Sequence, residues 1–316
     1  MRPGHRIRRL AVRSVAVGGL VLAALAGCTS AAGPVDGGAR PTTETGASRL
    51  HDGVPYARGR VLDVHVPTGA DPSTSASAPT VVLLHGCCGD RSDLGKLAEA
   101  LAAARLVVFN ADWAGLDADA TFPEAYADVV CAIRFARQHT GRFGGDPQRM
   151  VVAGWSDGAM TIAAVAASGD TFAGDGCLAG PQPDAEPLLG VVGISGFYGW
   201  TVPVGPAYVT PRASRLFGGD PDTAPEGWAA ATPYMWLAST PPTLLLVGTT
   251  DPLLDDARRY EAALRGAGRQ VRLVALPPDG DQTLISPRTS EGRLVVAEIA
   301  ALAGAAQPPH TSPENG

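Results

Sequence analysis

Short runs of β-branched residues alternate with longer alanine-rich segments from about residue 58 onward. This alternation is typical of strands connected by helices in a mainly parallel sheet that carries helices on both faces. We predict strands at 60–66, 80–84, 106–110, 149–153, 190–194, 243–248 and 271–276. We predict helices at 93–104, 123–139, 158–167, 253–266 and 290–303. The chain is therefore predicted to be of the α/β class, with one domain over residues 51–304.

Residues 196–240 interrupt this alternation and are rich in proline, tryptophan and tyrosine. We predict a small insertion here, placed over the carboxyl edge of the strands, where open α/β sheets bind ligands. Its aromatic side chains fit two interpretations equally well, the wall of an apolar pocket or the core of the insertion itself. They are Phe197, Tyr198, Trp200, Tyr208, Trp228, Tyr234 and Trp236.

The amino terminus has the pattern of an export signal. Five arginines precede an apolar run over residues 14–25, which is too short to span a bilayer. The segment ends in Leu-Ala-Gly-Cys and resembles a bacterial lipobox, so we predict a signal peptide at 1–27 and lipidation of Cys28; the alternative is an ordinary secretory signal. The protein would then be exported and held on the outer side of the cell membrane by its lipid anchor.

Two segments contain few large apolar side chains. Residues 28–50 consist mainly of small and polar residues, and we expect a disordered tether there. Residues 305–316 have a similar composition and are predicted to be a disordered tail.

The charge balance and the missing motifs exclude several classes of function. The formal net charge is −6, and it becomes more negative once the arginines of the signal are removed. An acidic domain is a poor partner for nucleic acid. No glycine-rich dinucleotide motif follows a predicted strand, and no residues stand at metal-ligand spacing. We therefore expect no cofactor and no metal.

Four cysteines follow Cys28, and export would place them where disulfides persist. Cys87 and Cys88 are neighbours, and a bridge between adjacent residues is strained. We therefore favour a disulfide between Cys131 and Cys177 and leave the pairing of Cys87 and Cys88 undetermined.

A candidate nucleophile lies in the sequence Gly154-Trp155-Ser156-Asp157-Gly158. The motif G-x-S-x-G is short enough to occur by chance, so its context decides its meaning. Here it joins a predicted strand to a predicted helix, which is where a nucleophile elbow forms. The sequence predicts that the Ser156 hydroxyl is presented at the start of this helix.

A second element, His85-Gly86-Cys87, directly follows the strand predicted at 80–84. In serine hydrolases a loop at this place supplies one of two backbone N–H groups that bind the tetrahedral oxyanion. We assign these donors to Cys87 and to Asp157, the residue after the nucleophile. The alternative for the loop is a plain tight turn.

Together these motifs resemble the α/β-hydrolase superfamily, in particular esterases related to bacterial carboxylesterases, feruloyl esterases and kynurenine formamidases. The resemblance runs from about residue 56 to 303 and includes LDVHVP, CAIRFARQHTGRFGGDPQRMVVAGWSDGAM and PPTLLLVGTTDPLL. It implies the α/β-hydrolase fold and the cleavage of a small carboxylic ester or acyl substrate through an acyl-enzyme on Ser156, without a cofactor.

The resemblance also assigns the acid and the base of a catalytic triad. The acid follows the strand after the insertion, which makes Asp251 the candidate; the alternative is an ordinary turn aspartate. The base is a histidine after the last strand, but the sequence there is Gly-Asp-Gln-Thr-Leu-Ile, with Gln282 at the base position.

An amide cannot accept a proton near neutral pH, so Gln282 removes the usual base. Three weaker substitutes remain: His85, His310 and Asp281. Two functions stay open: a serine esterase that lacks its ordinary base, and a catalytically impaired envelope lipoprotein that binds an ester, a lipid or a partner without turnover.

Overall fold

The computed structural model describes residues 43–304, except 47, 74–76, 88, 117–118, 183–185, 200–208 and 278–280. The predicted signal, Cys28, most of the predicted tether and the predicted tail lie outside the described residues. Within the described part, no helix is both long and apolar enough to cross a membrane.

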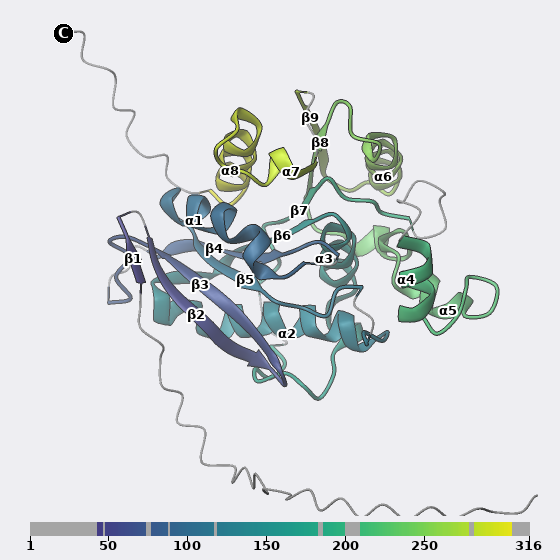
Figure 1. Ribbon diagram of the computed structural model, residues 1–316, viewed down its shortest axis with the longest axis horizontal. Helices are drawn as coiled ribbons and strands as arrows, with labels where there is room; N and C mark the ends of the chain where they lie inside the picture. Colours follow the sequence, from purple (N-terminus) through teal and green to yellow (C-terminus); the bar gives the residue numbers. More distant parts are fainter. Residues whose placement is uncertain are drawn as a thin grey trace, which may run out of the picture. The chain divides into compact units, whose positions relative to one another are not determined.

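The described residues form a sheet of nine strands in the order β1-β2-β3-β5-β4-β6-β7-β8-β9 (Figure 1). The pairs from β1 to β5 are antiparallel, and those from β5 to β9 are parallel. The strands are β1 (Thr43–Thr45), β2 (Ser48–Ala57), β3 (Arg60–Pro67), β4 (Ala78–Leu84), β5 (Val107–Ala111), β6 (Gly145–Trp155), β7 (Gly190–Ile194), β8 (Thr243–Gly248) and β9 (Val271–Leu276).

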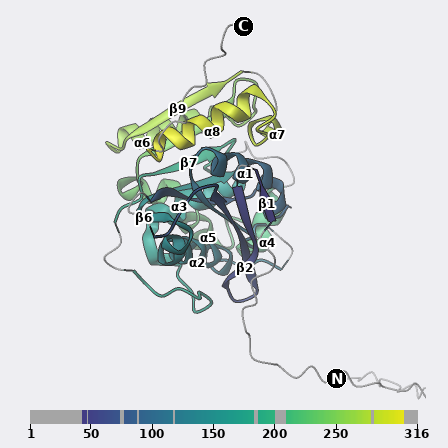
Figure 2. The same cartoon turned by 90° about the vertical axis from the view of Figure 1, so that its left-hand side faces the viewer.

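Helices cover both faces of this sheet. They are α1 (Gly95–Ala103), α2 (Glu124–His139), α3 (Asp157–Ser168), α4 (Val209–Leu216), α5 (Pro225–Ala230), α6 (Leu254–Gly266), α7 (Asp281–Leu284) and α8 (Ser290–Leu302). Figure 2 shows α1 and α8 together on one face, and α2, α3 and α6 lie on the other. Alternate residues of β4 fit these two layers: Val82 and Leu84 pack with α2 and α3, whereas Val81 and Leu83 pack with α1 and α8.

The α/β-hydrolase fold class is confirmed, and all seven predicted strands correspond to β3–β9. The boundary of the predicted tether was wrong, because residues 43–50 contain β1 and the start of β2. Ser48 pairs with Pro67 and His51 with Val64. Most of β2 is only half-buried, so backbone pairing with β3 holds it in place without the run of large apolar residues that would have revealed it.

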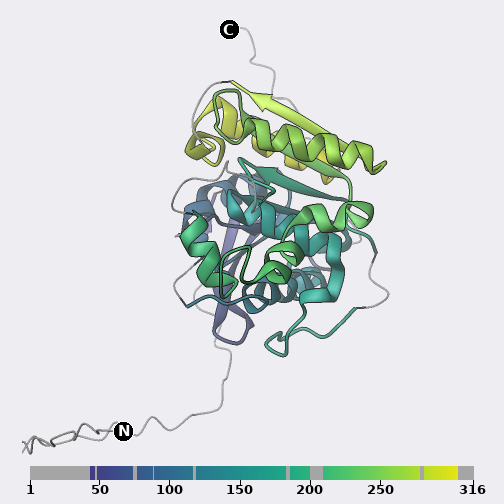
Figure 3. The ribbon, with the colours of Figure 1, turned by 90° about the vertical axis from the view of Figure 1, so that its right-hand side faces the viewer.

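The predicted insertion contains α4, α5 and the 3₁₀ helix Pro233–Ser239, between β7 and β8 (Figure 3). It reaches the carboxyl edge of the sheet, since Arg212 Nη1 of α4 lies 3.4 Å from Cys87 Sγ. The aromatic residues described here favour the core interpretation: Phe197, Tyr198 and Trp228 are at most 3% exposed. Trp200 and Tyr208 lie outside the described residues.

The predicted disulfide between Cys131 and Cys177 is confirmed, with Cα atoms 4.8 Å apart. It joins α2 to the segment that follows α3. The backbone of Cys177 also pairs with that of Ala57, at the end of β2, in an isolated antiparallel β-bridge. Cys87 is disulfide-bonded as well, while Cys88 lies outside the described residues.

Candidate active site

The strand order brings the predicted site residues to one edge of the sheet. β6 lies between β4 and β7, with β8 beyond β7, and these strands are parallel. Their carboxyl ends therefore point the same way, and the residues that follow them share one edge. His85 follows β4, Ser156 follows β6, Ser195 follows β7 and Asp251 stands three residues beyond β8.

Ser156 occupies the sharp turn that the sequence predicts. Its backbone has φ 57° and ψ −123°, a strained conformation for a residue with a side chain. A Cβ on Gly154 would stand 2.3 Å from the Gly158 carbonyl oxygen, and one on Gly158 would stand 2.3 Å from the His85 carbonyl oxygen. Both motif glycines are thus required by the close approach of backbone to backbone, and Ser156 stays half-buried at the start of α3.

The loop after β4 lies directly against the nucleophile. A Cβ on Gly86 would be 3.0 Å from Ser156 Cβ, so glycine permits this approach. One predicted oxyanion donor is engaged differently from expectation: the Cys87 N–H donates to Oδ1 of Asp157. The Asp157 side chain is 1% exposed, and nothing in the motif signals that a carboxylate would turn back onto this loop.

His85 was one candidate for a replacement base, but both of its ring nitrogens have other partners. Nδ1 lies 2.8 Å from the Gly86 carbonyl oxygen, and Nε2 lies 3.4 Å from Asp112 Oδ1. Burial opposes the charged form, but the Asp112 carboxylate and the Gly86 carbonyl outweigh it and raise the pKa of His85. His85 therefore fixes the conformation of its own loop.

The sequence analysis missed the ion-pair network behind His85. Arg91 binds Asp112 at 3.3 Å, Asp63 at 2.9 Å and Asp52 at 3.3 Å. These groups come from separate segments, β2, β3, the end of β5 and the turn before α1. Only the position of Asp112, two residues after the strand predicted at 106–110, could have indicated it.

Asp251 is 9% exposed and uses one of its carboxylate oxygens locally. Oδ1 accepts the Leu253 N–H at 2.8 Å, as a turn aspartate does. Oδ2 is buried and has no hydrogen-bond partner among the described residues. The second oxygen is what the triad interpretation requires and what a simple turn leaves unexplained.

Ser195 is a further residue at this edge that the sequence analysis did not identify. It has φ 44° and is completely buried, and its Oγ has no partner in the described part of the chain. Its neighbour Ile194 accepts the Ser156 N–H at 3.0 Å, which ties the two turns together. The sequence Ser-Gly at the end of a predicted strand was the available signal.

Gln282 lies in α7, in the segment after β9 where the base position was predicted. Its side chain is exposed and lines a cavity of about 310 Å³ with Asp93, Lys96 and Arg288. Neither Ser156 nor Asp251 lines this cavity, so the assignment of Gln282 to the base position stays a prediction. The side chains of Asp281 and His310, the other substitutes, lie outside the described residues.

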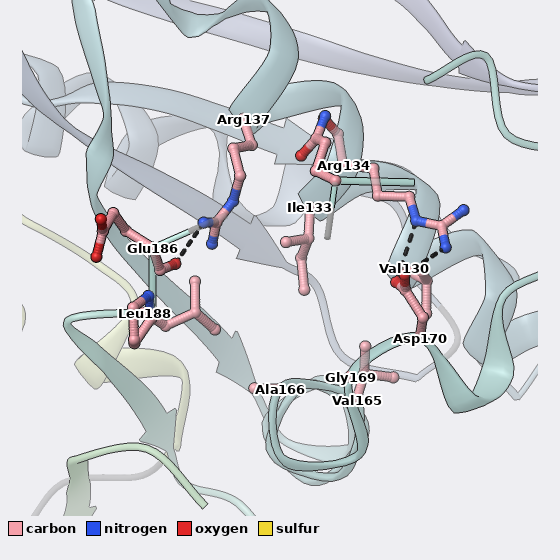
Figure 4. Close-up of a pocket in the computed structure, with 12 residues that line it drawn as sticks. Val130, Ile133, Arg134, Arg137, Val165, Ala166, Gly169, Asp170, Glu186 and Leu188 are labelled. Carbon is pink, nitrogen blue, oxygen red and sulfur yellow. Dashed lines mark hydrogen bonds and ion pairs between the residues drawn. The ribbon is translucent and has the colours of Figure 1, made fainter. Parts of the chain in front are cut away.

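A second cavity lies away from these residues, between α2 and α3 (Figure 4). This α2–α3 cavity has a volume of about 330 Å³ and is lined by Arg134, Arg137, Asp170, Gln182 and apolar side chains. Arg134 Nη2 pairs with Asp170 at 2.8 Å, and Arg137 Nη1 donates to the Glu186 carbonyl oxygen at 2.5 Å. None of the predicted site residues lines it.

The family of the chain follows from a match that covers most of the sheet and the elbow. The BD-FAE family matches residues 62–261, which include most of β3, all of β4 to β8 and both motif loops. The chain belongs to the BD-FAE family. A comparison with curated proteins gives no match.

Several solved esterase structures share the fold. An inhibited esterase B from Lactobacillus rhamnosis has 15% identity and a TM-score of 0.65, over 78% of this chain and 81% of that chain. Carboxyl esterase 2 from the mycorrhizal fungus Tuber melanosporum has 16% identity and a TM-score of 0.63, over 87% and 89%. Thermogutta terrifontis esterase 2, phosphonylated by sarin, has 18% identity and a TM-score of 0.60, over 76% and 88%. At these identities the likeness establishes the α/β-hydrolase fold.

Proposed function

We propose that this protein is a serine esterase that cleaves small carboxylic esters through an acyl-enzyme on Ser156. The strained backbone of Ser156 carries the proposal. A strained residue at the carboxyl edge of a sheet persists only where its surroundings enforce it, and such residues cluster at functional sites. The BD-FAE family membership and the esterase names of the structural relatives point to the same reaction.

The proposed reaction has two steps. Ser156 Oγ bonds to the acyl carbon, the ester carbonyl oxygen becomes an oxyanion, and the bond to the alcohol oxygen breaks. The alcohol leaves with the proton that the Ser156 hydroxyl has lost. Water then attacks the acyl-enzyme, which releases the carboxylic acid and restores the hydroxyl.

Asp251 is the proposed acid of the site, and Gln282 is the proposed occupant of the base position. Loss of a triad histidine lowers kcat by about 10⁶ in a serine protease and leaves about 10³–10⁴ over water from the oxyanion site and substrate binding. We therefore propose that the wild-type protein is a slow esterase.

A second function follows from the same substitution. A chain that keeps the elbow and the acid but not the base is equally suited to hold an ester, a lipid or a partner without cleaving it. This binding lipoprotein is the alternative proposal, and Gln282 is the observation that favours it.

We also propose that the protein is exported and anchored in the cell membrane through a lipid on Cys28, on the strength of its lipobox-like segment. Metabolic labelling with a palmitate analogue should mark the wild type and not the Cys28→Ala variant. Equal labelling of both proteins would contradict this proposal.

The esterase and binding proposals separate in one assay of 4-nitrophenyl acetate hydrolysis. We expect slow release of nitrophenol by the wild type and a gain of about 10²-fold or more in Gln282→His, because a positioned base contributes that much. The gain must disappear in Gln282→His combined with Ser156→Ala. No gain, together with no activity in the wild type above the Ser156→Ala variant, would support the binding protein instead.

A further inference from the structure

The carboxyl group of Asp157 lies where an esterase needs an empty site. Asp157 is the first residue of α3 and is 1% exposed. Its Oδ1 accepts the Cys87 N–H, and its Oδ2 is buried without a partner among the described residues. A buried carboxylate in this position is expensive, so it requires an explanation.

The groups that hold this carboxylate are those that would hold an oxyanion. In the proposed reaction the N–H groups of Cys87 and Asp157 bind the developing negative charge. The ionised form of the Asp157 carboxyl group is favoured by the backbone N–H groups of Cys87, Asp157 and Gly158. The carboxylate and an oxyanion therefore compete for the same donors, and their like charges repel each other.

The charges around Asp157 leave both of its protonation states accessible. Burial raises the pKa of Asp157 to about 7, against the opposing influence of His85 and the backbone N–H groups. Other charged groups described near this loop include Asp112, which contacts His85, Arg91, which binds Asp112, and Arg212, which lies beside Cys87 Sγ. Asp90 interacts with His85, and Asp93 lies against Gly89. Around neutral pH, protonation of the Asp157 carboxyl group can therefore change the character of the loop.

We propose that Asp157 is a positioning residue for the oxyanion site: its carboxylate holds the Cys87 N–H, and the site opens to an oxyanion when the carboxyl group is protonated or turns away. This inference rests on the proposed role of Ser156. The inference predicts that the hydrolysis rate is lowest at the pH values at which Asp157 is ionised. The G-x-S-x-G motif alone does not imply this pH dependence.

The test compares Asp157→Ala with the wild type in 4-nitrophenyl acetate hydrolysis from pH 5.5 to 8.5, after subtraction of the Ser156→Ala rate. The ratio of the two rates cancels the pH dependence that they share. We expect a ratio within about threefold of one at pH 5.5 and about 30 at pH 8.5. One oxyanion donor contributes 10²–10³ to kcat, so turnover comes mainly from the protonated form, and a carboxyl group with a pKa of about 7 is protonated in roughly one molecule in 30 at pH 8.5. The inverse ratio, the wild-type rate over the Asp157→Ala rate, should fall to half of its pH 5.5 value near pH 7, which is the midpoint of the change.

Two further variants make the result specific. Asp157→Asn keeps the shape and removes the charge, so it should show a smaller rise with the same midpoint, and it replaces Asp157→Ala if that variant does not fold. Asp170→Asn in the α2–α3 cavity removes a distant carboxylate, and its ratio should be independent of pH.

The outcomes distinguish this inference from the proposed function. A ratio close to one at every pH, with turnover that depends on Ser156, would overturn the inference and leave the esterase intact. Loss of activity in Asp157→Ala alone, beside a wild type that turns over through Ser156, would also overturn only the inference. Rates of the wild type and of Asp157→Ala that both stay at the Ser156→Ala rate at every pH would overturn the esterase proposal and the inference with it.

Discussion

The sheet edge around Ser156 and the α2–α3 cavity differ in whether their polar side chains have hydrogen-bond partners. Of the buried side-chain atoms without a hydrogen-bond partner among the described residues, four belong to residues that follow or end strands at this edge: Trp155 Nε1, Asp157 Oδ2, Ser195 Oγ and Asp251 Oδ2. In the α2–α3 cavity, Arg134 is paired with Asp170, Arg137 donates to a carbonyl oxygen, and the Gln182 amide donates to the Arg134 carbonyl oxygen at 3.0 Å.

This difference separates a cavity that stabilises the fold from an edge suited to chemistry. A folded protein leaves few buried polar atoms unpaired, because each one costs about 1–3 kcal/mol. At this edge they stand beside two turns with positive φ angles, at Ser156 and Ser195, and the combination of unpaired polar atoms with backbone strain is typical of functional sites.

The largest effect is expected from a methyl group at Gly158, with a methyl group at Gly169 as the matched control. Gly158→Ala should lower the free energy of unfolding by about 4 kcal/mol or prevent folding, because the new Cβ meets the His85 carbonyl oxygen at 2.3 Å. Gly169 lines the α2–α3 cavity, and a Cβ added there would meet no atom within 4 Å. Gly169→Ala should therefore be destabilised only by the backbone strain of a residue with a side chain at φ 61°, which costs about 1–2 kcal/mol. Urea denaturation measures both.

An equal loss in the two glycine variants would contradict the distinction between the regions. A Gly158→Ala protein with wild-type stability would show in addition that the loop after β4 does not pack on the elbow.

The next effect concerns the disulfide that joins α2 to the segment after α3. Replacement of Cys131 and Cys177 by serine should lower the free energy of unfolding by about 2–4 kcal/mol, because the bridge closes a long loop in the unfolded chain. The hydrolysis rate per folded molecule should not change. A loss of activity without a loss of stability would place this region within the functional site.

The smallest effect is expected from the ion pair of the cavity. Arg134→Met keeps most of the packing and removes the bonds to Asp170, which is itself 56% exposed at its side chain. We expect a loss of about 1 kcal/mol, in the range of a partly exposed ion pair. A thermal unfolding curve checks this, and a loss of several kcal/mol would show that the cavity depends on this charge.

The sequence predicted the features that local patterns determine. The runs of β-branched residues located β3 to β9, and the glycines of the motif located the elbow because backbone contacts demand them. Other features depend on long-range contacts and left no local pattern. β1 and β2 are held by pairing with distant strands, Ser195 is strained by its neighbours, and the Asp157 side chain turns toward a loop that lies 70 residues earlier.

The central claim is that Ser156 is a nucleophile, and an organophosphonate tests it directly. The phosphorus of a 4-nitrophenyl phosphonate accepts the Ser156 oxygen, nitrophenolate leaves, and the stable adduct adds its mass to the chain. Intact-mass measurement and peptide mapping of the wild type should show one adduct, on Ser156, and none in Ser156→Ala. An unmodified Ser156 after prolonged exposure, or an adduct on another residue such as Ser195, would contradict the account.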